Sequence, residues 1–178
     1  MTINANRRVA MYAGVAAIAA IAGAGVAWNR QAGNGKSDIT AEVMQAFWAA
    51  EFDTPTGESL PMSAFQGRPL VVNFWATWCP PCVEEMPLID VFFRQNQKNG
   101  WQVLGLAIDQ PSRVRQFMGQ FPVSYKIGLA GLGGTELGKI LGNEVGGLPF
   151  TVVLDAQGHL IQRKMGKLSP EDIRKWSV

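Results

Sequence analysis

The sequence predicts one α/β domain, in which a central mixed β-sheet is flanked by helices on both faces. Residues 70–76 (Leu-Val-Val-Asn-Phe-Trp-Ala) and 101–108 are short, mostly apolar runs, as expected of strands that are covered on both sides. Segments with helical periodicity follow these runs, and strands that alternate with helices are typical of this fold class. With 178 residues, the chain is long enough for one domain with a core and an additional segment.

The first elements of the domain are expected between residues 47 and 69. Phe47–Phe52 predicts an opening strand, and Thr54–Glu58 predicts a hairpin-like turn after it. Gly67-Arg68-Pro69 predicts a further turn ahead of the central strand. From Pro80 the periodicity becomes helical, with one apolar stripe formed by Cys82, Met86, Ile89 and Phe93.

The second half of the domain is expected to end in a hairpin and a short helix. Ser112–Phe121 and Thr135–Leu141 predict two helices. Phe150–Leu154 and His159–Lys164 predict a hairpin around the turn at residues 155–158. Ser169 is a suitable helix cap, because Pro170 follows at the first position and acidic residues fill the first turn.

Residues 1–30 are expected to form a membrane anchor or a signal segment. Val9–Trp28 is uncharged and, at 20 residues, long enough to cross a bilayer as a helix. Because Arg7 and Arg8 precede it, the positive-inside rule places everything after Trp28 outside the cytoplasm. Small residues within the run also fit cleavage by a signal peptidase. A polar linker at residues 31–40 then leads to the domain at residues 41–178.

The cysteine content points to redox chemistry. The chain has only two cysteines, Cys79 and Cys82, in the spacing C-x-x-C. A disulfide between them closes too small a loop to act as an effective structural staple. A zinc site needs about four ligands, and only His159 could add a nitrogen donor, so we expect no metal and no cofactor. The net charge of +2 is scattered along the chain, which argues against nucleic acid as a partner.

The two cysteines are expected to have different roles. Cys79 follows the central strand and starts a helix, where free backbone N–H groups and the helix dipole stabilise a thiolate. Such thiols have a pKa below about 8.5, and the thiolate attacks disulfides, so Cys79 is the expected nucleophile. Cys82 lies one turn inward on the apolar stripe and is the expected resolving cysteine. Together they would form a redox-active disulfide.

Glu85 is a candidate proton carrier for Cys82. It follows Cys82 by three residues and therefore lies beside it on the helix, at the edge of the apolar stripe. Partial burial would raise its pKa and suit it to take and return the Cys82 proton. The alternative is a solvated acid in the first turn of the helix, which is how we interpret Glu84.

The segment from Asn73 to Pro87, Asn-Phe-Trp-Ala-Thr-Trp-Cys-Pro-Pro-Cys-Val-Glu-Glu-Met-Pro, resembles the active-site block of the TlpA/ResA-like, membrane-tethered thioredoxin-fold proteins. Gly147-Leu148-Pro149-Phe150-Thr151 resembles the second signature of that family, which implies that Pro149 is cis and packs against the redox pair. The resemblance implies a thioredoxin-like fold with an amino-terminal extension and a central strand–helix insert, to which Trp101–Phe121 contributes. Asn73 stands where ordinary thioredoxins have a buried Asp, so its proton-relay role should pass to Glu85 or solvent.

The resemblance also implies a substrate site and partners. Clients would bind at Trp78, Pro80, Pro81, Leu148 and Pro149. Family members reduce disulfides of periplasmic or cell-surface proteins, including apocytochrome c and copper-site assembly proteins, and receive electrons from a membrane thiol transporter. The expected location is the inner membrane with the catalytic domain in the periplasm, or the soluble periplasm if the signal is cleaved.

Other functions of the same fold remain as alternatives. A peroxiredoxin-like peroxidase would need Thr at the position of Ala76, and a copper chaperone would need C-x-x-x-C with a suitably placed His. A tethered redox-sensing or client-binding module without turnover is possible on the residues alone. A thiol oxidase is a further alternative, because proteins with this fold have reduction potentials from about −270 to about −120 mV.

Overall fold

The computed structural model describes residues 41–177. The anchor or signal at residues 1–30 and the linker at residues 31–40 lie outside this range, so both stay predictions. Within the described range, the helices are too short or too polar to cross a membrane.

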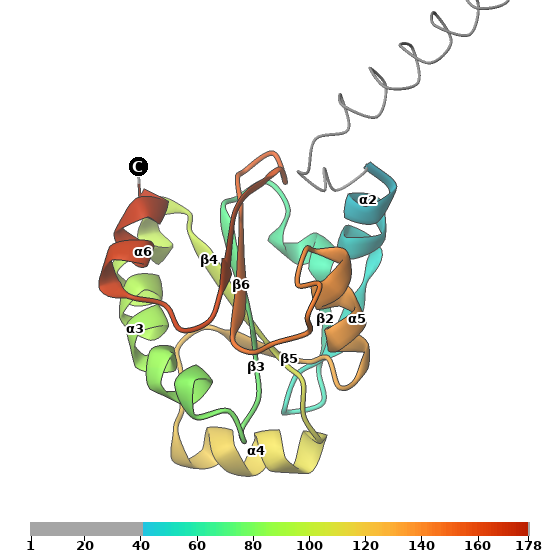
Figure 1. Ribbon diagram of the computed structural model, residues 1–178, viewed down its shortest axis with the longest axis vertical. Coiled ribbons are helices and arrows are strands. Elements are labelled where there is room, and N and C mark those ends of the chain that lie inside the picture. The colour runs from blue at the N-terminus through green and yellow to red at the C-terminus, as the bar shows by residue number, and fades with distance from the viewer. Residues whose placement is uncertain (1–40, 178) are drawn as a thin grey trace, which may run out of the picture. The chain divides into compact units, whose positions relative to one another are not determined.

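A seven-stranded mixed sheet forms the centre of the domain (Figure 1), in the order β2-β1-β5-β4-β3-β6-β7. β3 pairs with β4 in parallel and with β6 in antiparallel orientation, so it is an interior strand of the sheet. β5 is parallel to β4, and β1–β2 and β6–β7 are antiparallel pairs. The strands are β1 (Glu51–Asp53), β2 (Ser59–Pro61), β3 (Leu70–Trp75), β4 (Gln102–Ala107), β5 (Lys126–Leu129), β6 (Phe150–Leu154) and β7 (Leu160–Met165).

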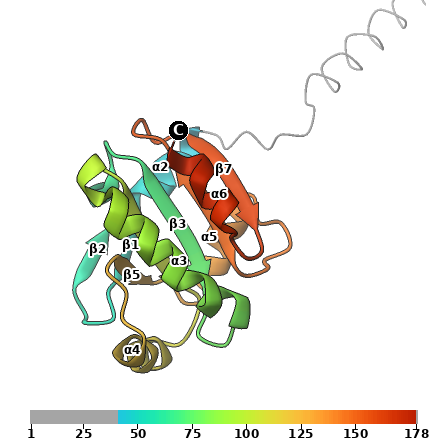
Figure 2. The ribbon, with the colours of Figure 1, turned by 90° about the vertical axis from the view of Figure 1, so that its left-hand side faces the viewer.

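Helices cover both faces of this sheet (Figures 1 and 2). α3 and α6 lie on one face, α2 and α5 lie on the other, and α4 lies at the end of the sheet where β3 ends. The α-helices are α2 (Ala41–Ala49), α3 (Pro80–Asn96), α4 (Pro111–Gln120), α5 (Gly133–Ile140) and α6 (Pro170–Arg174). Short 3-10 helices span Met62–Phe65, Gln97–Asn99 and Lys175–Ser177.

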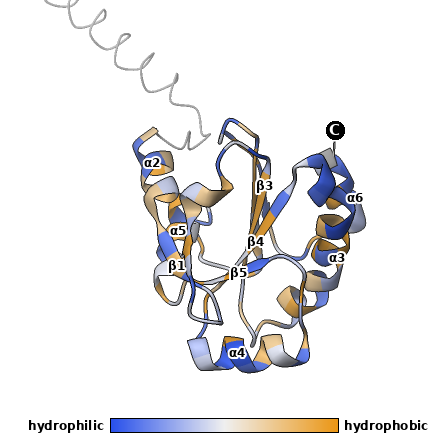
Figure 3. Cartoon of the chain, turned by 180° about the vertical axis from the view of Figure 1, so that it is seen from behind, coloured by the Kyte–Doolittle hydropathy of each residue, from blue (hydrophilic) through white to orange (hydrophobic). Residues whose placement is uncertain are grey.

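Two hydrophobic clusters flank the sheet, because side chains alternate along each strand. The first cluster lies under α3 and α6 and contains Val71, Trp75 and both cysteines. The second lies under α2 and α5 and contains Leu70, Val72 and Phe74. Hydropathy colouring (Figure 3) shows mostly apolar central strands, whereas the helices combine hydrophilic and hydrophobic residues. All six residues of β3 are buried, as the apolar run predicts.

Most predicted elements are confirmed, with boundaries shifted by one or two residues. The turn at residues 54–58 closes the β1–β2 hairpin, and the Thr54 N–H donates to the Glu58 carbonyl. Ser169 caps α6 in a capping box with Asp172. Two strand–helix units, β4–α4 and β5–α5, separate α3 from β6 and so supply the expected insert.

Three details of the predicted elements are wrong. Phe47 lies in α2 rather than in a strand, because Ala41–Ala49 is composed mostly of good helix formers and the chain becomes extended only at Glu51. The strand β5 was not predicted, since Lys126–Leu129 is short and contains a glycine. On α3, Phe92 is 3% exposed and fills the stripe position expected for Phe93, which is only half-buried.

Candidate active site

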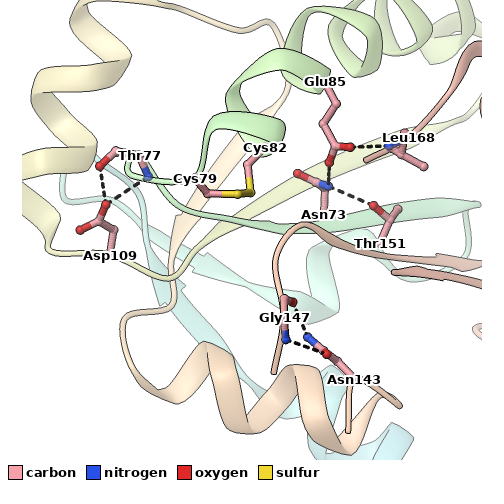
Figure 4. The surroundings of a disulfide bond; sticks show 10 residues. All are labelled: Asn73, Thr77, Cys79, Cys82, Glu85, Asp109, Asn143, Gly147, Thr151 and Leu168. Carbon is pink, nitrogen blue, oxygen red and sulfur yellow. Dashed lines mark hydrogen bonds between the residues drawn. A yellow bond between two sulfur atoms is a disulfide. The ribbon is translucent and has the colours of Figure 1, made fainter. Parts of the chain in front are cut away.

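The cysteine pair lies at the start of α3, directly after the central strand. Cys79 is the N-cap of α3, and its carbonyl accepts hydrogen bonds from the N–H groups of Cys82 and Val83, both at 3.1 Å. The two cysteines form a disulfide with their Cα atoms 5.3 Å apart (Figure 4). Cys79 is 4% exposed and Cys82 is completely buried. Cys82 is thus the less exposed of the two, as expected, and Cys79 is the sulfur closer to solvent.

Asp109 fixes the loop that leads into the disulfide. It follows β4, and its Oδ2 accepts hydrogen bonds from the Thr77 hydroxyl and from the Thr77 N–H, the latter at 3.1 Å. Burial alone would raise the pKa of Asp109, but hydrogen bonds from Thr77 and Gln110 outweigh it and lower the pKa. The sequence reasoning missed this contact. The position of Asp109 just after β4 could have indicated it. β3 and β4 pair in parallel, so the residues that follow their carboxyl ends lie at the same edge of the sheet.

Glu85 is buried completely, more deeply than the partial burial expected from the sequence. Its Oε1 accepts a hydrogen bond from Asn73 Nδ2 at 2.7 Å, and its Oε2 accepts one from the Leu168 N–H at 2.6 Å. Burial raises the pKa of Glu85, and this effect outweighs the hydrogen bonds and the nearby Lys167 charge, which lower it. A carboxyl group with a raised pKa therefore lies one helical turn after Cys82, and the solvated alternative is wrong.

Asn73 connects Glu85 to the sheet. It lies on β3 directly opposite Thr151 of β6, and its Nδ2 donates to the Thr151 hydroxyl at 3.0 Å as well as to Glu85. Among the described residues, its Oδ1 atom has no hydrogen-bond partner. Figure 4 shows Asn73 between Glu85 and Thr151, and the Leu168 N–H directed at the other oxygen of Glu85. The sequence reasoning noted Asn73 but did not anticipate that it holds Glu85.

The residues predicted to bind substrate lie in two segments, one at the cysteine pair and one at a cis peptide bond, and their binding role stays a prediction. Trp78 is 60% exposed, Pro80 is exposed and Pro81 is half-buried. The peptide bond between Leu148 and Pro149 is cis, as the resemblance implied. Leu148 packs against both hydrophobic clusters, one of which contains the two cysteines.

The described residues include exposed apolar side chains and a groove at Trp78, the residue before Cys79. Leu132 and Val145 are 89% and 83% exposed. Trp78 and Leu132 line an open groove of about 590 Å³, with Asp109 and Arg113 as its charged members. Within the described residues, no group of three or more His, Cys, Asp or Glu side chains is placed to hold a metal ion. The arrangement therefore supplies thiol chemistry and an apolar contact surface.

Sequence comparisons match the Redoxin family over residues 37–175. The thiol-disulfide oxidoreductase ResA of Bacillus cereus is 27% identical over 119 residues, which cover 66% of each chain. The ResA of Geobacillus kaustophilus is 29% identical over 116 residues, or 64% of each chain. These matches span slightly less than two thirds of each relative.

Comparisons of the structure find proteins of the same fold. A thiol:disulfide interchange protein from Chlorobium tepidum TLS superposes with a TM-score of 0.62 at 26% identity, covering 71% of this chain and 89% of that one. StoA from Bacillus subtilis superposes with a TM-score of 0.59 at 21% identity, covering 72% of this chain and 96% of that one.

Proposed function

The chain belongs to the Redoxin family, with the thioredoxin-like fold and cysteine pair of its ResA-like thiol-disulfide oxidoreductases, and we propose that it reduces disulfides of client proteins outside the cytoplasm. It is an enzyme of thiol–disulfide exchange. The observation that carries the proposal is the combination of Cys79 at the start of α3 with a buried carboxyl group three residues after Cys82.

Cys79 makes the first attack. At the N-cap of α3 its thiolate is stabilised by the free N–H groups of the first helical turn and by the helix dipole. The thiolate attacks one sulfur of a client disulfide, so that a mixed disulfide forms and the other client sulfur leaves as a thiolate. That leaving thiolate takes up a proton from solvent.

Cys82 completes the reaction with Glu85 as its proton acceptor. Cys82 is completely buried, and once the disulfide is reduced its thiol must lose its proton before it can attack Cys79 Sγ. Glu85 lies on the same side of α3 and is held by Asn73 and Leu168. The attack breaks the mixed disulfide, releases the reduced client and leaves Cys79 and Cys82 oxidised. Two electrons pass to the client in each cycle.

Clients bind along the apolar surface beside the disulfide. Trp78 offers an exposed ring next to Cys79, and the Leu148–Pro149 loop offers backbone groups that can pair with an extended segment. The aliphatic and aromatic character of this surface favours flexible client segments that expose both a cysteine and apolar side chains. Apocytochrome c and copper-site assembly proteins are clients of this kind, proposed by family likeness.

The dithiol is regenerated by a membrane thiol transporter, and residues 1–30 hold the domain at the outer face of the inner membrane, or direct it to the periplasm if they are cleaved. The apolar run Val9–Trp28 and the preceding Arg7 and Arg8 support this location. Fractionation of cells that produce the full chain separates the two forms. A membrane-bound chain of full mass supports the anchor, whereas a soluble and shortened chain supports cleavage.

Reduction of insulin by the reduced full chain tests the enzymatic function. Wild-type protein should catalyse it, and Cys79→Ser should abolish it. Cys82→Ser should accumulate mixed disulfides with clients, because the second attack is lost. No catalysed reduction by a folded protein with both cysteines would leave only the redox-sensing or client-binding alternative. Trapping by Cys79→Ser instead of Cys82→Ser would reverse the two assignments.

Equilibration with glutathione buffers decides the direction of the reaction. A reductant should have a potential toward about −270 mV, whereas a value toward about −120 mV would make the protein a thiol oxidase.

A further inference from the structure

Asn143 is a buried polar residue outside the cysteine and Glu85 network, and it is 3% exposed. It follows α5, and its amide pairs with both peptide groups of Gly147 (Figure 4). Asn143 Nδ2 donates to the Gly147 carbonyl at 2.8 Å, and the Gly147 N–H donates to Asn143 Oδ1 at 3.1 Å. The Gly146 N–H also donates to the Asn143 carbonyl at 3.0 Å.

These contacts hold the loop that ends at Pro149. Both Gly146 and Gly147 bond to Asn143, so one residue anchors two successive peptide groups of the loop. Asn143 is itself attached to α5, because its N–H donates to the Gly138 carbonyl at 2.9 Å. The loop is thus tied to a helix through Asn143. Gly147 lies close to its neighbours, since a Cβ there would approach Met165 Sδ to 3.3 Å.

The pairing with Gly147 leaves Leu148 as the residue with free backbone groups. Among the described residues, neither the Leu148 N–H nor its carbonyl takes part in a backbone hydrogen bond. Leu148 also packs against the cluster that contains the cysteines. An extended client segment can pair with these two groups by strand addition, which provides affinity through main-chain hydrogen bonds.

We propose that Asn143 is a positioning residue that presents Leu148 to protein clients, an inference that rests on the proposed function. Asn143 satisfies Gly147 and fixes the loop before a client arrives, which lowers the ordering cost of binding. A small disulfide without a peptide segment of comparable length does not use this pairing. Loss of Asn143 therefore weakens reactions with proteins and spares reactions with small disulfides.

Steady-state kinetics of Asn143→Ala test this assignment. We expect the KM for insulin to rise about tenfold with little change in kcat, because two hydrogen bonds that fix the loop are lost. The rate with cystamine, a small disulfide, and the redox potential should stay at wild-type values. Asn96→Ala is the matched control. It removes another side-chain hydrogen bond to the backbone, from Asn96 Nδ2 to the Phe92 carbonyl at 2.9 Å, at the far end of α3.

An unchanged KM for insulin, or an equal loss with cystamine, would overturn the positioning role. If Asn143→Ala does not fold, Asn143→Asp replaces it, since the aspartate still accepts from the Gly147 N–H but cannot donate to the carbonyl. The KM for insulin should then rise, because the hydrogen bond to the Gly147 carbonyl is lost, while the rate with cystamine should stay at the wild-type value. Failure of the proposed function is a different result, because wild-type protein would then reduce cystamine but not insulin.

Discussion

The two faces of the central sheet differ in what the same strands contribute to them. Under α2 and α5, β3 contributes only the apolar side chains Leu70, Val72 and Phe74. Under α3 and α6, it contributes Asn73 between two apolar residues. On the first face, the polar side chain of Gln102 lies at the start of β4 and donates to the Phe65 carbonyl. One face therefore stabilises the domain, and the other gives up part of its apolar packing to hold a carboxyl group.

Replacement of Phe74 should have the largest effect on stability. Phe74 is fully buried and lies against Phe150, with ring centroids 5.7 Å apart. Phe74→Ala should lower the free energy of unfolding by about 3–5 kcal/mol, through lost burial and a cavity. Denaturant unfolding measures the loss. The redox potential of the folded fraction should not change, and a shifted potential would mean that the two faces are not independent. Phe74→Leu is the milder control.

Replacement of Glu85 should have its main effect on the reaction rate. Glu85→Gln should slow the attack of Cys82 on the mixed disulfide about a hundredfold, which is typical for loss of a general base. Release of a client from a preformed mixed disulfide, followed in a rapid-mixing instrument, isolates this step. Glu84→Gln is the matched control, because Glu84 is the exposed neighbour and should leave the rate unchanged. Equal rates for the two variants would remove Glu85 from the mechanism.

The raised pKa of Glu85 also lowers the free energy of unfolding at higher pH. Between the ordinary pKa of 4.5 and the raised one, the folded protein holds a proton that the unfolded chain has lost. Stability therefore falls as the pH rises through this window and is highest below it. Denaturant unfolding across this range should show the wild type losing stability relative to Glu85→Gln. An opposite slope would place the pKa of Glu85 below its ordinary value.

Replacement of Asn73 should have a smaller effect, which is a shift in the pH dependence of the resolving step. Its hydrogen bond lowers the pKa of Glu85, so Asn73→Ala should raise that pKa further. The pH dependence of the resolving step should then move to higher pH. Thr151→Val keeps the contact between Asn73 and Glu85 and removes only the contact between Asn73 and Thr151, so it should move the profile less. A profile that does not respond to Asn73→Ala would show that this contact does not tune Glu85.

Lys167 should have the smallest effect. Its ion pair with Glu84 joins two side chains that are about half exposed, and its charge slightly lowers the pKa of Glu85. Lys167→Gln should change the free energy of unfolding by less than about 0.5 kcal/mol. Any shift of the pH profile should disappear at high salt, because exposed charges are screened. The shift caused by Asn73→Ala should persist there, and a salt-resistant effect of Lys167 would contradict its surface role.

The sequence predicted features that depend on neighbouring residues, and it did not predict contacts between residues far apart in the chain. The apolar run of β3, the start of α3 and the cap at Ser169 are local patterns, and all three are confirmed. The proximity of Glu85 to Cys82 also follows from helical spacing. The partners of Glu85 do not, because Leu168 lies 83 positions away and its contact depends on the completed fold.

Short elements with mixed composition were the other source of error. Phe47 belongs to a helix of nine residues that begins at Ala41, and β5 has four residues with Gly128 among them. Gly128 is required by close packing, since a Cβ there would approach Leu106 Cδ2 to 3.0 Å. Such a contact across neighbouring strands cannot be inferred from periodicity. A glycine usually weakens a strand, but in β5 the close packing of the neighbouring strand requires it.

The segment that follows β7 matters for anyone who produces this protein. Leu168 donates to Glu85, Ser169 caps α6 in the next position, and Trp176 packs edge-to-face on Phe92 at 5.1 Å. A truncation ahead of Ser169 would therefore remove the helix and the aromatic contact that follow the Leu168 bond to the proton acceptor.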